Sequence, residues 1–176
     1  NNFIRDLHTE IHKVKPWVKF GVSPFGIWRP GYPKQIKGLD AYDALYADAR
    51  LWLREGWLDY CAPQLYWPIS AKAQSYPALM QWWHEQNPKR RHLWPGNNTA
   101  RIDPWPAKEI ISQIDLTRRH PGATGNIHWN LSALHDNRKE IATKLQSGAY
   151  AQHALPPASP WLDSRPPKAP VVGIHW

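Results

Sequence analysis

The sequence predicts an α/β fold in which short parallel strands alternate with helices. Three observations lead to this expectation. Apolar segments of strand length begin near residues 18, 59, 91 and 125, so they recur every 30 to 40 residues or so. A helical pattern follows each segment, and the repeat is long enough for a helix to connect neighbouring parallel strands. From residue 151 onward a proline-rich composition ends the repeat.

The first elements are set by apolar spacing and by residues that start or stop helices. Residues 1–15 should form a helix, because its apolar positions share one face: Ile4, Leu7, Ile11 and Val14. Residues 18–23 follow as a strand, and a loop rich in Gly and Pro extends to residue 39. Asp40 can cap a helix that runs to Arg54 and stops at Gly56.

The same reasoning assigns the remaining elements up to residue 147. We expect strands at 58–66, 91–95 and 125–131, and helices at 76–85, 107–119 and 137–147. The chain would then hold four strand–helix units preceded by one helix. A complete eight-unit barrel takes about 250 residues, so residues 1–150 correspond to about half of a (β/α)8 barrel. An opening helix without a preceding strand, in a chain without an initiator Met, suggests an entry into the middle of a larger fold.

The residues after 150 suggest a second kind of structure. We interpret residues 151–170 as a Pro-rich linker, which cannot form a regular helix or a central strand. Residues 171–176 are apolar and resemble the first strand of a following domain.

Composition limits the classes of function. The net charge of +8 would suit an anionic partner, but the basic residues are scattered, and the short clusters at 89–92 and 118–120 follow predicted helices, whose carboxyl ends favour cations. We therefore expect no nucleic-acid partner. The single cysteine, Cys61, excludes a disulfide framework and suggests a buried thiol. Apolar runs are interrupted within about ten residues, too short for a transmembrane segment.

Aromatic residues point to carbohydrate. The chain has 12 Trp, several times the ordinary usage and more than one core of this size requires. Residues 57–67 place Gln64, Tyr66 and Trp67 at the end of a predicted strand. Flat rings can cover the C–H faces of a sugar while an amide binds its hydroxyls, and packing in the core is the alternative.

Three longer segments make a family resemblance specific. They are Phe-Gly-Val-Ser-Pro-Phe-Gly-Ile-Trp-Arg at 20–29, Tyr-Ala-Asp-Ala-Arg-Leu-Trp at 46–52, and Gly-Trp-Leu-Asp-Tyr-Cys-Ala-Pro-Gln-Leu-Tyr-Trp at 56–67. In order and spacing they resemble the glycosyl-hydrolase-like family 10 proteins, a bacterial (β/α)8 group. The resemblance covers roughly residues 1–155. It implies that the four strands are barrel strands five to eight, and that the linker leads to a fibronectin-type β-sandwich beginning at 171–176.

The resemblance also implies a function. It indicates a glycoside hydrolase that acts on a polysaccharide, with bacterial cell-wall glycan as the suggested substrate and an exported location in the periplasm, the cell envelope or the medium. No cofactor is implied. The acidic motif of the family, a pair of Asp followed by aromatics at the end of strand four, would precede Asn1. Catalytic residues of this chain are therefore unknown, and we expect the segment alone to be inactive.

The candidate substrate-binding residues are mostly neutral and follow the predicted strands. In parallel strands they would converge on one end of the sheet. They are Ser23, Trp28, Arg29, Gln64, Tyr66, Trp67, Asn97, Trp129 and Asn130. Arg29 has a second interpretation, in which it holds a carboxylate of the preceding part of the barrel.

The 14 acidic residues give no catalytic pair, because none directly follows a predicted strand. Glycosidases use two carboxylates about 5 to 10 Å apart. Asp59 begins its strand and Asp48 lies within a helix, so both are expected to make local structural contacts. Asp40, Asp103 and Asp136 follow strands and are expected to be helix caps or loop residues, although they are the acids closest to the predicted groove.

Other chemistries are less well supported. His8 and His12 lie four apart on a helix, but Glu10 does not directly follow the first His as in zinc proteases, so we expect a solvated helix flank and no metal. A non-catalytic carbohydrate-binding module is the main alternative to an enzyme. The open edges of a half-barrel predict self-association.

Overall fold

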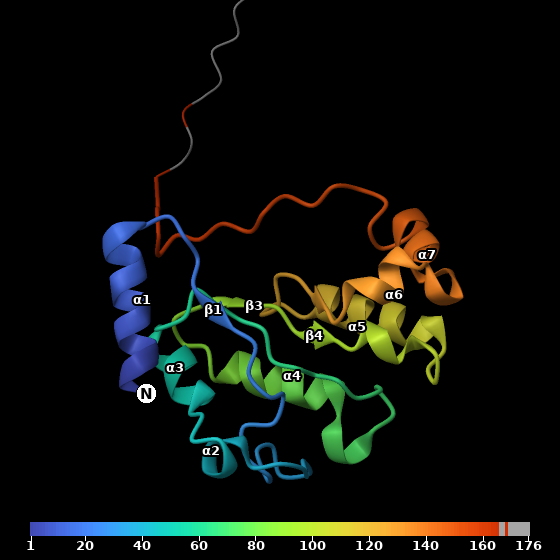
Figure 1. The fold of residues 1–176 in the computed structure, drawn as a ribbon, viewed down its shortest axis with the longest axis horizontal. Helices are drawn as coiled ribbons and strands as arrows, with labels where there is room; N and C mark the ends of the chain where they lie inside the picture. The colour runs from blue at the N-terminus through green and yellow to red at the C-terminus, as the bar shows by residue number, and fades with distance from the viewer. Residues whose placement is uncertain (166–167, 169–176) are drawn as a thin grey trace, which may run out of the picture.

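The structure is a computed structural model that describes residues 1–165 and residue 168 (Figure 1). Its centre consists of parallel strands in sequential order, as the sequence predicts. β1 (Gly21–Val22), β2 (Tyr60–Cys61) and β3 (His92–Leu93) form one sheet, and β4 (Gly96–Asn97) pairs with β5 (Ile127–His128). The α/β class with parallel strands is therefore confirmed.

The regular strands are shorter than predicted, and β1, β2 and β3 each end two residues before a proline. Pro24, Pro63 and Pro95 follow β1, β2 and β3, and a proline has no backbone N–H to donate. Their carbonyls still accept: Gln64 N bonds to Pro24 O, Gly96 N to Pro63 O and Ile127 N to Pro95 O. The parallel ladder thus continues past these three prolines, and Pro95, the last residue of the predicted third strand, separates β3 from β4, which begins just after it.

Helices follow the strands, with two differences from prediction. Their bounds are α1 (Asn2–Val14), α2 (Ala41–Ala44), α3 (Ala49–Glu55), α4 (Tyr76–Glu85), α5 (Ala107–Arg119), α6 (Leu131–His135) and α7 (Ile141–Ser147), with 3-10 turns at Lys72–Gln74, Thr99–Ile102 and Arg138–Glu140. The predicted helix at 40–54 is two helices, because Asp40 caps α2 and Asp48 caps α3 separately. Gly56 ends α3 with a left-handed φ of 75°, as expected.

The second difference concerns the fourth strand. It ends at His128, and the residues that we expected to extend it to 131 already begin α6. Asn130 is the reason, because its side chain accepts a hydrogen bond from Ser132 N and caps that helix.

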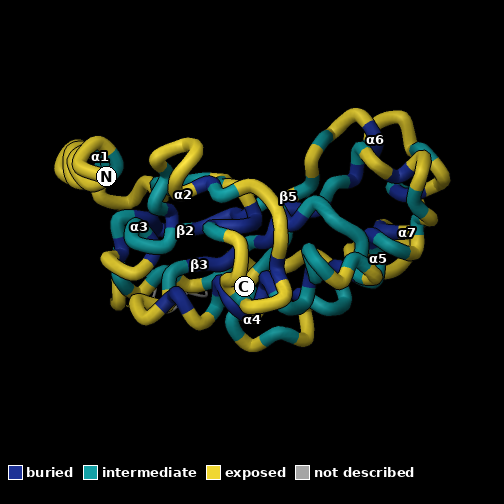
Figure 2. The backbone as a smooth tube through the Cα atoms, turned by 90° about the horizontal axis from the view of Figure 1, so that it is seen from below, coloured by how far each residue is buried: buried dark blue, intermediate teal, exposed yellow. Residues whose placement is uncertain are grey.

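Two hydrophobic clusters form the core (Figure 2). The larger one packs α3 and α4 against the three-stranded sheet, with Leu53, Leu58, Leu65 and Trp83 fully buried. The smaller one joins α5, α6 and α7 through residues such as Ile110 and Ile141. Cys61 is completely buried, as expected, and burial raises the pKa of its thiol.

α1 stands at the margin of the molecule, and none of its residues is buried (Figure 1). Its predicted apolar face is only partly covered, because Ile4 packs against the larger cluster whereas Val14 is 70% exposed. Of the described residues, no helix is both long and apolar enough to cross a bilayer.

The segment after α7 returns across the molecule to the side of α1 (Figure 1). Residues 151–165 contain no helix or strand, which agrees with the linker-like composition, but the end of this segment is docked. Trp161 Nε1 donates to Asp59 Oδ1 at 2.8 Å, and Ser159 Oγ lies 2.9 Å from His92 Nε2. The predicted sandwich strand at 171–176 lies outside the described residues.

Candidate functional site

The carboxyl ends of the strands bring most of the predicted site residues to one edge. β1 leads into Ser23, and the bridge between Phe25 and Gln64 continues the β1–β2 pairing. Gln64 also bridges Gly96, the first residue of β4. β5 leads into Trp129, whose N–H donates to Asn97 O at 2.8 Å. Ser23, Gln64 and Trp129 therefore occupy successive positions along what we call the C-terminal edge.

Gln64 is at the centre of this edge and is held on both sides. Its Nε2 donates to Ser23 O at 2.9 Å, which fixes the amide and leaves Oε1 without a partner among the described hydrogen bonds. The neighbouring strand can approach because residue 26 is glycine: a Cβ there would lie 2.3 Å from Gln64 O.

A small pocket opens beside Gln64. It has a volume of about 190 Å³. Its lining is mainly apolar and includes Phe25, Trp28 and Trp83, while Ser23 and Gln64 add polar groups. Complete ligand pockets usually measure about 300 to 1,000 Å³, so this one is smaller than a typical complete site.

The aromatic residues of the C-terminal edge differ in exposure. Trp129 is 57% and Phe25 46% exposed, so both offer a ring face to solvent. Trp67 is half-buried and packs against the larger core cluster. Tyr66 is also half-buried, and its desolvation raises the pKa of the phenol. Sequence reasoning missed Phe25, although its position two residues after Ser23 placed it at the same strand exit.

Asn97 differs from expectation, because it is fully buried. Its Nδ2 donates to Gln113 Oε1 at 2.9 Å and to Tyr76 Oη at 3.3 Å, and its Oδ1 accepts from Asn126. The amide therefore completes a polar network under the edge and has no donor left for a ligand. Asn130 likewise uses its side-chain oxygen to cap α6.

Trp28 and Arg29 belong to an aromatic cluster behind the edge. Trp28 is 8% exposed, stacks on Trp82 and donates from Nε1 to Asp48 at 3.1 Å. Arg29 Nε donates to Asp40 Oδ2 at 3.0 Å, so its carboxylate partner comes from this chain. Although desolvation acts the other way, hydrogen bonds from Asp43 N and Arg29 lower the pKa of Asp40.

The acids do not form a catalytic pair at this edge. Asp103 pairs with Arg138, and Asp136 with its neighbour His135. A carboxyl group with a lowered pKa, such as Asp40, is unsuited to donate a proton near neutral pH. Throughout residues 1–165 no Asp or Glu directly follows a strand, as the sequence indicated.

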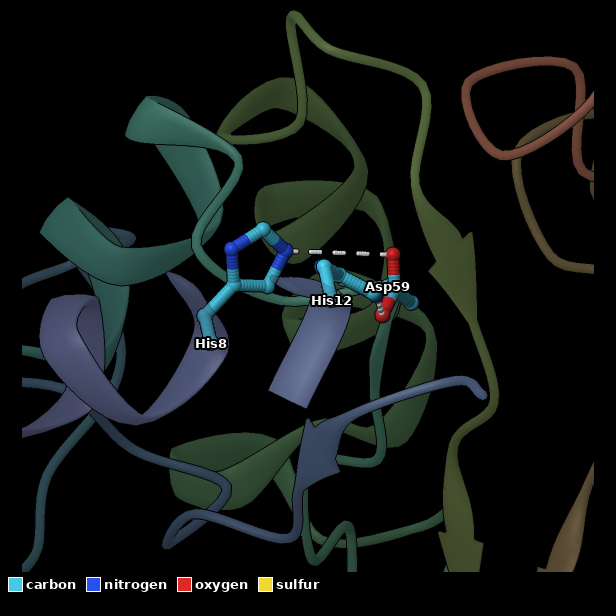
Figure 3. Close-up of side chains that lie close together, drawn as sticks. All are labelled: His8, His12 and Asp59. Carbon is cyan, nitrogen blue, oxygen red and sulfur yellow. Dashed lines mark ion pairs between the residues drawn. The ribbon is translucent and has the colours of Figure 1, made fainter. Parts of the chain in front are cut away.

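The amino ends of the strands carry a different cluster (Figure 3). Asp59 is fully buried, just before β2, and its Oδ2 accepts from Phe20 N at 2.7 Å and lies 2.9 Å from His12 Nε2. The structural role predicted for Asp59 is thus confirmed. The solvated flank predicted for His8 and His12 is wrong, because both side chains are largely covered and face Asp59 from α1.

The structure consists of parallel strands joined by helices, with aromatic and amide side chains at the C-terminal edge. It is therefore an α/β protein whose candidate site lies where such folds bind ligands. A family model described as Glycosyl hydrolase-like 10 matches residues 1–112. The chain belongs to this family.

Two curated relatives extend the match. The chain is 38% identical over 184 aligned residues to glycosyl hydrolase YngK of Bacillus subtilis strain 168, covering 98% of this chain and 36% of the relative. It is 39% identical over 157 residues to glycosyl hydrolase DigH of Escherichia coli strain K12, covering 80% of this chain and 36% of that protein. The chain thus spans about a third of the length of these relatives.

Proposed function

We propose that this chain forms one wall of the substrate groove of a glycoside hydrolase, as the C-terminal half of a (β/α)8 barrel. The observation that carries the proposal is the C-terminal edge itself, where Gln64 lies between the exposed rings of Phe25 and Trp129 in a chain of the glycosyl hydrolase-like family. Parallel strands in sequential order are part of the arrangement that a barrel requires.

The edge is suited to orient a sugar. The free Oε1 of Gln64 can accept from a hydroxyl, Ser23 adds a hydroxyl of its own, and Trp129 offers a face to the C–H groups of a pyranose. The pocket beside Gln64 is smaller than a typical complete ligand site, so an open groove that continues onto other parts of the protein fits these dimensions better than a closed cavity.

Catalytic carboxylates are proposed to come from the preceding part of the barrel. Glycosidic bond cleavage needs one group that protonates the leaving oxygen and another that attacks or activates water. Of the acids in this chain, Asp40 and Asp48 cap helices and Asp103 pairs with Arg138, so none of these three is free at the carboxyl ends of the strands. In this proposal the substrate is a bacterial cell-wall glycan and the protein acts outside the cytoplasm.

The test compares two proteins on one substrate. Reducing-end release from soluble cell-wall glycan is measured with this chain and with a protein extended at the amino end through the family's acidic strand. We expect turnover only from the longer protein, because loss of a catalytic carboxylate costs several orders of magnitude in rate. Equal turnover by both would refute the placement of the catalytic acids, and Asp103 and Asp136 would be the first residues to replace.

A carbohydrate-binding module without activity is the second candidate, favoured by the lack of a carboxylate directly after the carboxyl ends of the strands in residues 1–165. It predicts that the longer protein binds the same glycan and releases no reducing ends. Binding measured beside turnover therefore separates the two functions.

A further inference from the structure

The cluster at the amino ends of the strands contains three potential metal ligands. His8 and His12 are one helical turn apart on α1 and point the same way, and Asp59 faces them from the start of β2 (Figure 3). One donor atom from each of the three residues lies within 4.8 Å of the other two. His12 Nε2 is 2.9 Å from Asp59 Oδ2, and His8 Nε2 is 3.9 Å from Oδ1.

One donor atom of this cluster has no partner. His8 Nε2 is inaccessible to solvent and makes no hydrogen bond, which is uncommon for a buried polar atom. Desolvation, with the neighbouring His12 and Arg91, lowers the pKa of His8 and so favours the neutral ring, the form that binds metals.

We propose that His8, His12 and Asp59 bind one divalent first-row transition ion, for which Zn²⁺ is the natural probe. Two imidazoles and a carboxylate suit zinc and its neighbours, whereas Mg²⁺ and Ca²⁺ prefer oxygen ligands alone. Ligands around a four-coordinate zinc ion lie about 3.3 Å apart, given bonds of about 2.0 to 2.1 Å. The observed separations straddle that value, so modest side-chain rotations would close the site.

The hydrogen bonds of the metal-free site show which contacts of His12 a bound ion would replace. His12 Nε2 contacts both Asp59 Oδ2 and Val18 O, so in the metal-free state this nitrogen carries the proton. Binding of a metal moves that proton to Nδ1 in the neutral tautomer. A pocket of about 230 Å³ borders the three side chains and leaves room for a water as the fourth ligand.

The surroundings hold the carboxylate in place. Phe20 N donates to Oδ2 at 2.7 Å and Trp161 Nε1 to Oδ1 at 2.8 Å, the kind of outer contact that orients metal-binding carboxylates. Arg91 also borders the pocket and repels a cation. The ion would join α1, the sheet and the segment after α7, so its role in this proposal is structural.

The first experiment titrates the metal-stripped chain with Zn²⁺ in a calorimeter. We expect one ion per chain and a rise in melting temperature. Co²⁺ in its place should give visible absorption bands that disappear when Zn²⁺ is added. Failure of the wild-type chain to bind either ion at a ratio of one to one would overturn the proposal.

Variants assign the site. His8→Gln and His12→Gln should each weaken Zn²⁺ binding at least about tenfold, and Trp161→Phe, which removes an outer contact, about 10- to 100-fold. Arg91→Gln should tighten Zn²⁺ binding, a result that a cluster held only by hydrogen bonds, without a metal, would not produce. The matched control is His135→Ala, because His135 lies 3.0 Å from Asp136 in an exposed pair without a third ligand.

The outcomes are separable even where a variant is unstable. Circular dichroism identifies a variant that does not fold. In that case the Zn²⁺ affinity of Arg91→Gln, compared with that of wild type, decides whether the cluster binds the metal. Unchanged affinity in folded His8→Gln and His12→Gln proteins, or a loss of binding in His135→Ala, would contradict the assignment. None of these readouts depends on glycan hydrolysis, so the metal proposal can fail without affecting the proposed function.

Discussion

The carboxyl and amino ends of the parallel strands have similar backbone geometry but carry side chains with different roles. At the carboxyl end the side chains are neutral and partly exposed, with Gln64 between Phe25 and Trp129. At the amino end the carboxylate of Asp59 is fully buried. It contacts donors in α1, in Phe20 just before β1 and in the segment after α7. The difference shows that a charged, covered cluster can be structural while the exposed, uncharged edge is the better candidate for binding.

The largest expected effect comes from breaking the amino-end cluster. Asp59→Ala removes the acceptor of Phe20 N and Trp161 Nε1 and leaves both donors in a covered site. Loss of one partner from a buried charged network costs about 3 to 5 kcal/mol. We expect a large drop in the denaturant midpoint of unfolding. A change below about 1 kcal/mol, on the scale of an exposed ion pair, would show that the cluster contributes little. Asp136→Ala, at an exposed pair, is the matched control.

A smaller effect on stability is expected from the protonation of one histidine, His128, at the carboxyl end of β5. His128, in β5, has its Nδ1 2.7 Å from Thr99 Oγ1 and its Nε2 2.8 Å from Tyr150 Oη, with Arg118 beside Tyr150. Desolvation lowers the pKa of His128 below its usual 6.5. The unfolded chain then binds a proton more readily than the folded one, so this stability is present above pH 6.5 and is lost as pH falls toward the lowered value.

The measurement is the melting temperature as a function of pH. In His128→Gln the slope below pH 6.5 should be shallower than in wild type. Parallel slopes in His128→Gln and wild type would mean that this imidazole does not contribute to acid sensitivity.

The smallest expected effect concerns glycan binding by two tryptophans of the C-terminal edge, the exposed Trp129 and the packed Trp67. Trp129→Ala should weaken glycan binding by about 1 kcal/mol, the worth of one aromatic contact, with little change in melting temperature. Trp67→Ala should lower the melting temperature as well, because Trp67 packs on the core. If Trp129→Ala binds glycan as wild type does, the edge is not the groove wall.

The sequence allowed good prediction of features that depend on near neighbours. The strand order, the stop at Gly56 and the position of Asp59 at the beginning of its strand all follow from spacing and local propensity. β4, which begins just after the predicted third strand ends at Pro95, was missed, because the Pro95 carbonyl still pairs with Ile127 while its nitrogen cannot donate.

Features that depend on distant neighbours were not predictable. Nothing in the pattern of α1 distinguishes His8 and His12 as covered residues, since their partner Asp59 lies about 50 positions away. Asn97 looked like a residue at a strand exit, but burial depends on Tyr76, Gln113 and Asn126, which surround it only after the helices have packed.

The contact between Asp59 and Trp161 has a consequence for the order of folding. The two residues are 102 positions apart, so a ribosome must synthesise the whole strand–helix repeat before Asp59 gains this donor. Closing so long a loop is entropically costly until the intervening elements have formed. During synthesis the carboxylate can already accept from Phe20 N, whereas the indole that covers it arrives last. The return of the chain to its own beginning thus makes this contact a late event in maturation.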